Sequence, residues 1–131
     1  MHFDFLKELF SKYVVEICFE EDVETVYIRN SLFDFPIVVH YFPDDYYKYL
    51  LCFATQHRDT SSKDDLISYI SSFINAEKAA IEFYKDGMNC FGGEIETAVL
   101  DDLTYNSLRL KFGYHDLKDF TFSVRAWDKR F

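Results

Sequence analysis

The sequence of 131 residues is poor in glycine and proline, with 4 and 2 of them. Soluble domains usually contain about 7% glycine and about 5% proline, so collagen-like, linker-like and low-complexity chains are excluded. No apolar run approaches the roughly 20 residues that a transmembrane helix needs. Hydrophobic residues nevertheless make up 49% of the chain, and aromatic residues 20%. The composition therefore predicts one folded domain over residues 1–131, with short loops and a substantial core.

Cysteine is also scarce, and its 3 residues, Cys18, Cys52 and Cys90, are odd in number and form no CxxC pair. This arrangement indicates free thiols rather than a disulfide framework. The N-terminal stretch carries acidic side chains among its apolar ones and lacks the basic start of a secretory signal peptide. Together these features predict a protein of the reducing cytoplasm.

Recognisable catalytic motifs are absent: the sequence has no GxGxxG, GxxxxGK[ST], HExxH or GxSxG, and no EF-hand loop. Its 4 histidines have no spacing that would form a local metal site: His2, His40, His57 and His115. We therefore predict that the protein is not an enzyme and that it binds neither a cofactor nor a metal.

Two helices are expected from the hydrophobic periodicity. Residues 3–13 place their apolar side chains on one half of a helical wheel and their polar side chains on the other. A longer helix of 24 residues is expected from Lys63 to Asp86, with Ser62 as its N-cap and Gly87 as its stop.

Strands are expected where apolar and polar side chains alternate, and loops are expected over 56–61 and 90–93. The predicted strands cover residues 13–20, 23–29, 37–42, 46–55, 94–100, 107–114 and 120–127. The first two are expected to form a hairpin, and runs of consecutive strands favour an antiparallel sheet. The predicted fold is therefore α+β. It has an antiparallel sheet of about six to seven strands, with a short N-terminal helix and one long helix packed on one face, in the order α-β-β-β-β-α-β-β-β.

Negative charge is the strongest chemical signal, with 14 Lys+Arg, 23 Asp+Glu and a formal net charge of -9. Residues 1–65 hold 6 basic and 13 acidic side chains, a balance of -7, whereas residues 66–131 hold 8 and 10, a balance of -2. Such a surface repels nucleic acid and anionic membranes and attracts a basic protein. The alternative is that the acidic residues only keep the protein soluble.

Two acidic segments in the first half are the predicted partner-binding surface. Their tyrosines supply contact area with a polar tip beside the carboxylates. The surface comprises Glu20, Glu21, Asp22, Glu24, Asp44, Asp45, Tyr46 and Tyr47. The sheet face that the helices leave uncovered would suit a second copy of the chain, which would give a homodimer. The alternative to the partner-binding surface and to the homodimer is that these aromatic side chains simply stack within the core.

Glu77 does not fit the helical pattern. On the predicted long helix it lies within the apolar stripe, between Phe73 and Ile81. A buried carboxylate there would line a pocket and could act in acid–base catalysis. Alternatively, the helix overshoots the sheet or kinks at Asn75-Ala76, and Glu77 then reaches water or an arginine of a strand.

These observations favour a small acidic cytoplasmic domain that holds or neutralises a basic protein partner. In length, acidity and element order the chain resembles small acidic secretion chaperones and the immunity proteins that neutralise bacterial toxins. This resemblance is one of overall shape and involves no shared motif. One alternative is a ligand-binding or enzymatic domain with a cavity near Glu77, between the long helix and the sheet. A structural subunit of a larger assembly is another.

Overall fold

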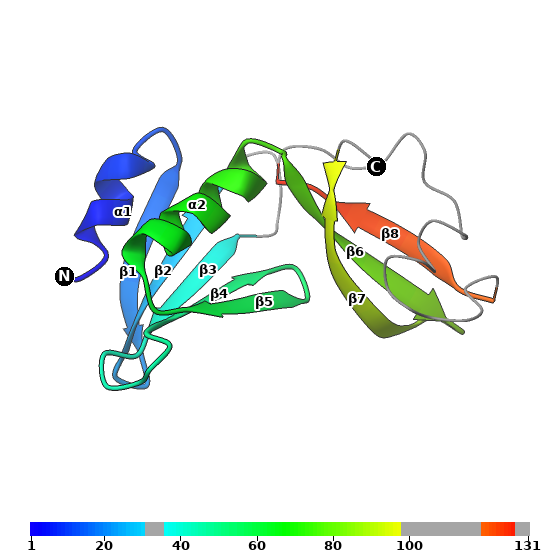
Figure 1. Ribbon diagram of the computed structural model, residues 1–131, viewed down its shortest axis with the longest axis horizontal. Helices are drawn as coiled ribbons and strands as arrows, with labels where there is room; N and C mark the ends of the chain where they lie inside the picture. Colours follow the sequence, from blue (N-terminus) through cyan, green and yellow to red (C-terminus); the bar gives the residue numbers. More distant parts are fainter. Residues whose placement is uncertain (31–35, 98–118, 128–131) are drawn as a thin grey trace.

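The computed structural model describes residues 1–30, 36–97 and 119–127 of the chain (Figure 1). Within these residues, two helices accompany two antiparallel sheets, one of five strands and one of three. The predicted α+β class and the antiparallel pairing are therefore confirmed. The single sheet of six to seven strands is wrong, because the strands on either side of residue 75 belong to different sheets.

The larger sheet is a meander in chain order, in which each strand pairs with the next. Its strands are β1 (Val14–Glu20), β2 (Val23–Arg29), β3 (Ile37–Tyr41), β4 (Tyr49–Phe53) and β5 (Gln56–Thr60). β1 and β2 form the predicted hairpin. Its two turn residues, Glu21 and Asp22, have φ of 51° and 66°. A two-residue turn with both φ values positive matches the right-handed twist of the paired strands.

The strand β5 occupies residues that the sequence predicted as a loop. Phe53 pairs with Gln56, so only Ala54 and Thr55 connect β4 to β5. Ala54 has φ of 53°, a conformation that the sequence does not announce because alanine rarely adopts it. The polar composition of β5 follows from its place at the edge of the sheet, where polar side chains are well tolerated.

Both helices, α1 (Asp4–Leu9) and α2 (Lys63–Ile74), pack on one face of the larger sheet (Figure 1). α1 is shorter than the predicted helix over residues 3–13. α2 begins where the sequence predicts, because the Ser62 hydroxyl accepts a hydrogen bond from the Asp65 amide at 3.3 Å. The side chains buried between the helices and the sheet include Phe3, Leu6, Val26, Ile28, Ile37, Val39, Leu51, Phe53, Leu66, Ile70 and Phe73. No helix or strand among the described residues covers the opposite face.

The predicted 24-residue helix is wrong in its second half. α2 ends at Ile74, and Ala76 adopts the left-handed conformation with φ of 57°, which interrupts the helical repeat. The following residues form β6 (Lys78–Lys85), whose central residues are buried on both faces. A strand that is covered on both faces has no polar side to alternate with its apolar side, so it can imitate a buried helix in sequence.

The smaller sheet has the order β7-β6-β8, with β7 at Met88–Glu96 and β8 at Thr121–Arg125. Asp86 and Gly87, with φ of 53° and 78°, form the turn between β6 and β7, so Gly87 is not a helix stop. The loop expected over 90–93 lies within β7. The strand predicted over 94–100 overlaps β7, the one over 120–127 overlaps β8, and the one over 107–114 lies outside the described residues.

Trp127 and Gly92 mark how the two sheets meet. Trp127 follows β8 yet is buried in the core of the larger sheet, with its ring 6.4 Å from that of Phe53. At Gly92 on β7, a Cβ atom would lie 2.5 Å from the Ile81 carbonyl oxygen and 2.7 Å from the Gln56 side-chain nitrogen. Glycine is therefore required where the β4–β5 hairpin packs against β7.

The helices of the described segments are too short and too polar to span a bilayer.

Candidate functional site

The β1–β2 turn and the β3–β4 connection lie at the same end of the larger sheet (Figure 1). Tyr41, the last residue of β3, pairs with Glu24 near the start of β2 and with Tyr49 at the start of β4. Five exposed carboxylates gather at this end, which we call the acidic end: Glu20, Glu21, Asp22, Asp44 and Asp45. The structure thus brings together residues that stand more than 20 positions apart in the sequence.

Two tyrosines extend from the same connection. Tyr46 and Tyr47 are 80% and 54% exposed, and their rings meet edge to face with centroids 4.9 Å apart. The loop that carries them is held by Lys48, whose Nζ donates to the Pro43 carbonyl at 2.9 Å. The acidic end therefore presents aromatic area beside its carboxylates, as the sequence predicts for these residues.

Glu24 does not belong to this surface, and its prediction as a partner-binding residue is wrong. It is only 7% exposed, and its carboxylate accepts the backbone N–H groups of His2 at 3.1 Å and Phe3 at 2.7 Å. The alternation of β2 places Glu24 on the core face with Val26 and Ile28. Its role is to anchor the chain that leads into α1.

A groove of about 530 Å³ opens beside the acidic end. It is lined by Glu20, Glu21, Val23, His40, Phe42 and Leu50. Glu20 accepts a hydrogen bond from the Tyr27 hydroxyl, and this bond, together with partial burial, raises the pKa of Tyr27. The groove is therefore lined by three apolar side chains, Val23, Phe42 and Leu50, together with two glutamates and a histidine.

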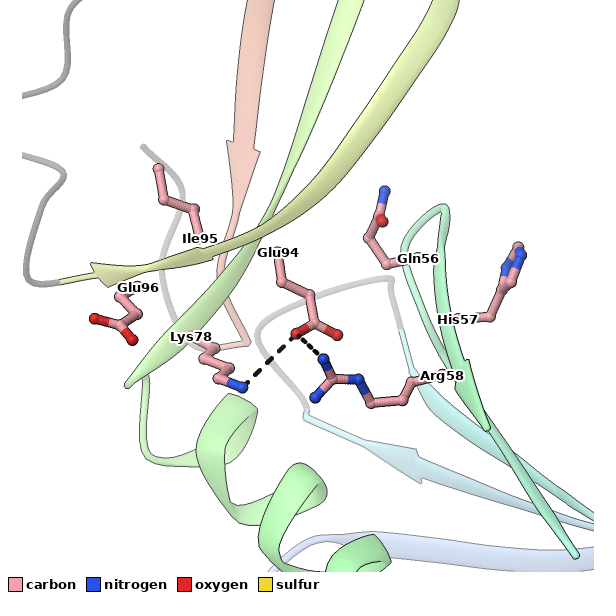
Figure 2. Close-up of a pocket in the computed structure, with 7 residues that line it drawn as sticks. All are labelled: Gln56, His57, Arg58, Lys78, Glu94, Ile95 and Glu96. Atoms are coloured by element: carbon pink, nitrogen blue, oxygen red, sulfur yellow. Dashed lines mark ion pairs between the residues drawn. The ribbon is translucent and has the colours of Figure 1, made fainter. Parts of the chain in front are cut away.

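A second pocket, of about 450 Å³, lies where β5 meets β7 (Figure 2). Arg58 and Lys78 both point toward Glu94, with N–O distances of 3.4 Å and 3.7 Å to the same oxygen. The Arg58 guanidinium also lies over the Tyr69 ring of α2, 4.3 Å from its centroid. His57 lines the pocket, but its side chain points away from the ion pairs. This cluster joins both sheets to α2, so it is a structural clamp.

Glu77 is exposed, so the burial that the helical pattern implied is wrong. It lines a third pocket, of about 380 Å³, with Ala76, Lys78, Glu96 and Thr97. Its exposure agrees with the alternative that Glu77 reaches water, but the helix neither overshoots the sheet nor kinks: it ends at Ile74, and the chain continues as β6. The hypothesis of an enzymatic cavity thereby loses the buried carboxylate on which it rested.

The second buried carboxylate of the described chain is Glu82, which is 3% exposed. It accepts hydrogen bonds from the Thr55 hydroxyl at 3.3 Å, the Arg125 Nε at 3.4 Å and the Tyr84 hydroxyl. Burial alone would lower the pKa of Arg125, but the hydrogen bond with Tyr84 and the charge of Glu82 outweigh this effect. The pKa of Arg125 is therefore raised above its ordinary value. Sequence reasoning missed this network because it assigned Glu82 to a helix, where it would not face Arg125.

Two of the cysteine thiols, those of Cys18 and Cys52, are poor candidates for nucleophiles. Burial, followed by neighbouring carboxylates, raises the pKa of both Cys18 and Cys52, so the reactive thiolate is disfavoured. Within residues 1–30, 36–97 and 119–127, no group of three or more His, Cys, Asp or Glu side chains is arranged to hold a metal ion.

The fold and these surfaces define a small α+β domain with an acidic, tyrosine-bearing end beside an apolar groove. No protein-family model, curated protein or solved structure matches the chain. A functional proposal therefore rests on the chemistry of its own residues.

Proposed function

We propose that this protein is a small acidic cytoplasmic binding domain that holds or neutralises a basic protein partner at its acidic end. The observation that carries the proposal is the gathering of five exposed carboxylates from two separate connections at one end of the sheet. Charges within the Debye length of about 8 Å act together on an approaching ion, so such a group attracts a basic surface more strongly than dispersed carboxylates. Tyr46 and Tyr47 would add contact area.

The chemistry of this surface also restricts the class of partner. Phosphate groups of nucleic acids and anionic lipids carry the same sign of charge as the acidic end, and their approach is opposed. Lysine and arginine side chains carry the opposite sign, and tyrosine is among the residues enriched where proteins bind one another. A basic segment of another protein is therefore the partner that these residues suit best.

The proposal is tested with two variants that each remove four negative charges. The first changes the acidic end: Glu21→Gln, Asp22→Asn, Asp44→Asn and Asp45→Asn. The matched control changes exposed carboxylates elsewhere: Glu8→Gln, Glu77→Gln, Asp86→Asn and Glu96→Gln. The probe is a short fluorescent peptide of alternating lysine and serine, whose affinity is measured by anisotropy at low and physiological salt.

We expect the acidic-end variant to bind this peptide at least about 10-fold more weakly than the control, which corresponds to about 1.4 kcal/mol. Amide NMR shifts on addition of the peptide should concentrate at residues 20–23 and 42–48. Equal loss of affinity in both variants would mean that only net charge matters, and the acidic end would then serve solubility alone.

A further inference from the structure

We infer that the groove beside the acidic end takes a single lysine or arginine side chain of the partner. The aliphatic stem would lie on Val23, Phe42 and Leu50, and the cationic head would reach Glu20, Glu21 and His40. This inference rests on the proposed function and names the chemical group that the site recognises.

The apolar part of the groove suits a hydrocarbon stem. Leu50 and Phe42 are only half-buried, although they lie in or beside the central strands of the sheet. Lysine and arginine bury three or four methylene groups along apolar surface while their charged heads stay at a polar rim. A groove lined by both apolar side chains and carboxylates matches that division.

His40 adds a hydrogen-bond acceptor to the two carboxylates. Its Nδ1 lies 2.9 Å from the Thr25 hydroxyl oxygen, and that hydroxyl donates its proton to the Val23 carbonyl at 3.2 Å. In the neutral ring, the tautomer that donates from Nδ1 to the Thr25 oxygen leaves Nε2 as an acceptor. Ammonium and guanidinium groups carry donors only, so they match this set of acceptors.

Other occupants fit the groove less well. A second copy of the chain would bring its own acidic end toward the first, and the two would repel. A purely apolar side chain would cover Glu20 and Glu21 without offering a donor, and a carboxylate removed from water without a partner is strongly disfavoured. The combination of a long apolar stem and a cationic head avoids both difficulties.

The stem is tested by changing the probe. The lysines of the lysine–serine peptide are replaced by 2,4-diaminobutyric acid, which keeps the ammonium group and removes two methylenes. Each buried methylene contributes about 0.8 kcal/mol, which corresponds to about 4-fold in affinity, so with partial burial we expect about 5-fold to 10-fold weaker binding. Unchanged affinity would mean that charge alone is recognised, and the inference would be overturned.

The groove itself is tested with Leu50→Thr, which replaces an apolar lining side chain by a β-branched polar one. The matched control is Val38→Thr on the same uncovered face, outside the groove. We expect Leu50→Thr to weaken the lysine peptide about 5-fold and Val38→Thr less than 2-fold. The diaminobutyric acid peptide should lose little further affinity with Leu50→Thr, because the stem and Leu50 share one contact.

Failure of this inference is distinguishable from failure of the proposed function. If Leu50→Thr and Val38→Thr bind the peptide alike while neutralisation of the acidic end still weakens binding, the groove is not the stem site but the acidic end still binds. If neutralisation of the acidic end has no more effect than its control, the proposed function falls and the inference falls with it. Circular dichroism of each variant establishes that the fold is retained.

Discussion

Substitution of Glu24 by glutamine should destabilise the fold more than the corresponding substitution of an exposed carboxylate does. The Glu24 carboxylate holds the backbone N–H groups of His2 and Phe3, at 3.1 Å and 2.7 Å. Glutamine has nearly the same shape, but it offers one oxygen and one NH₂ group in place of two oxygens. One of the two backbone donors would then face another donor. Since Phe3 is fully buried, its displacement would open the core under α1.

The magnitude follows from these contacts. A hydrogen bond to a charged group contributes about 1.5–3 kcal/mol, and a buried donor left without a partner costs about 1–3 kcal/mol. For Glu24→Gln we therefore expect a loss of about 2–4 kcal/mol in the free energy of unfolding. With a urea m-value of about 2 kcal/mol/M, the unfolding midpoint should fall by roughly 1–2 M.

Trp127 provides the assay, because it is the only tryptophan of the chain and is 1% exposed. Its fluorescence in a urea titration reports the core that includes Phe3. The control is Glu21→Gln at an exposed turn position, for which we expect a change within about 0.5 kcal/mol. If Glu24→Gln is no more destabilising than Glu21→Gln, the two hydrogen bonds do not stabilise the fold and the reasoning is refuted.

Three further predictions concern buried or constrained positions. Burial, and then the charge of Lys63, lowers the pKa of His2 below its ordinary 6.5. Below that pH the folded state therefore binds fewer protons than the unfolded state. The unfolding free energy should fall as the pH drops below about 6.5. Glu82→Ala should cost about 3 kcal/mol in urea unfolding, since it removes a buried partner of the partly exposed Arg125. Gly92→Ala should cost about 1–3 kcal/mol in the same assay, because the new methyl group meets backbone.

Each of these predictions has a control. His2→Gln places a neutral polar side chain beside Tyr49 and should flatten the pH dependence below about pH 6.5. An unchanged slope would assign the pH dependence to another group. Glu94→Ala, at the half-buried clamp of Figure 2, should cost less than Glu82→Ala, because Glu94 is 21% exposed and Glu82 is 3% exposed. Gly87→Asn creates no steric conflict, since no atom lies within 4 Å of its added Cβ, so its cost is limited to the backbone strain at φ of 78° and should be smaller than that of Gly92→Ala. Equal costs at positions 87 and 92 would contradict the packing argument.

Most of the first 60 residues can be predicted from the sequence, because the larger sheet has one covered and one uncovered face. The alternation in β1 and β2 is therefore visible, and the hairpin follows from it. The prediction of a helix over the residues of β6 was wrong because β6 is covered on both faces, so its sequence shows no alternation of apolar and polar side chains. The Asp86-Gly87 dipeptide was the available signal, because Asp-Gly favours a two-residue hairpin turn.

Some of the carboxylate positions can likewise be predicted from the sequence, and others cannot. Neighbouring acidic residues in the sequence predict the acidic end, since turns expose whatever they contain. Glu24 could have been separated from it, because its alternation with Val26 and Ile28 places it on the core face. Glu82 could not, because its partner Arg125 stands 43 positions away in the chain and no local pattern joins them.

The acidic end also has a consequence for stability that separates binding from solubility. Carboxylates that gather at one end repel one another in the folded state, whereas the unfolded chain can move them apart. Neutralising Glu21, Asp22, Asp44 and Asp45 should therefore raise the thermal midpoint at low salt, by more than neutralising dispersed carboxylates does. The same change should weaken binding of the basic peptide, a trade-off expected of a surface that serves function. Thermal unfolding at low and high salt measures this, and salt should remove most of the gain. A variant that loses both stability and binding would instead mean that these carboxylates are part of the fold.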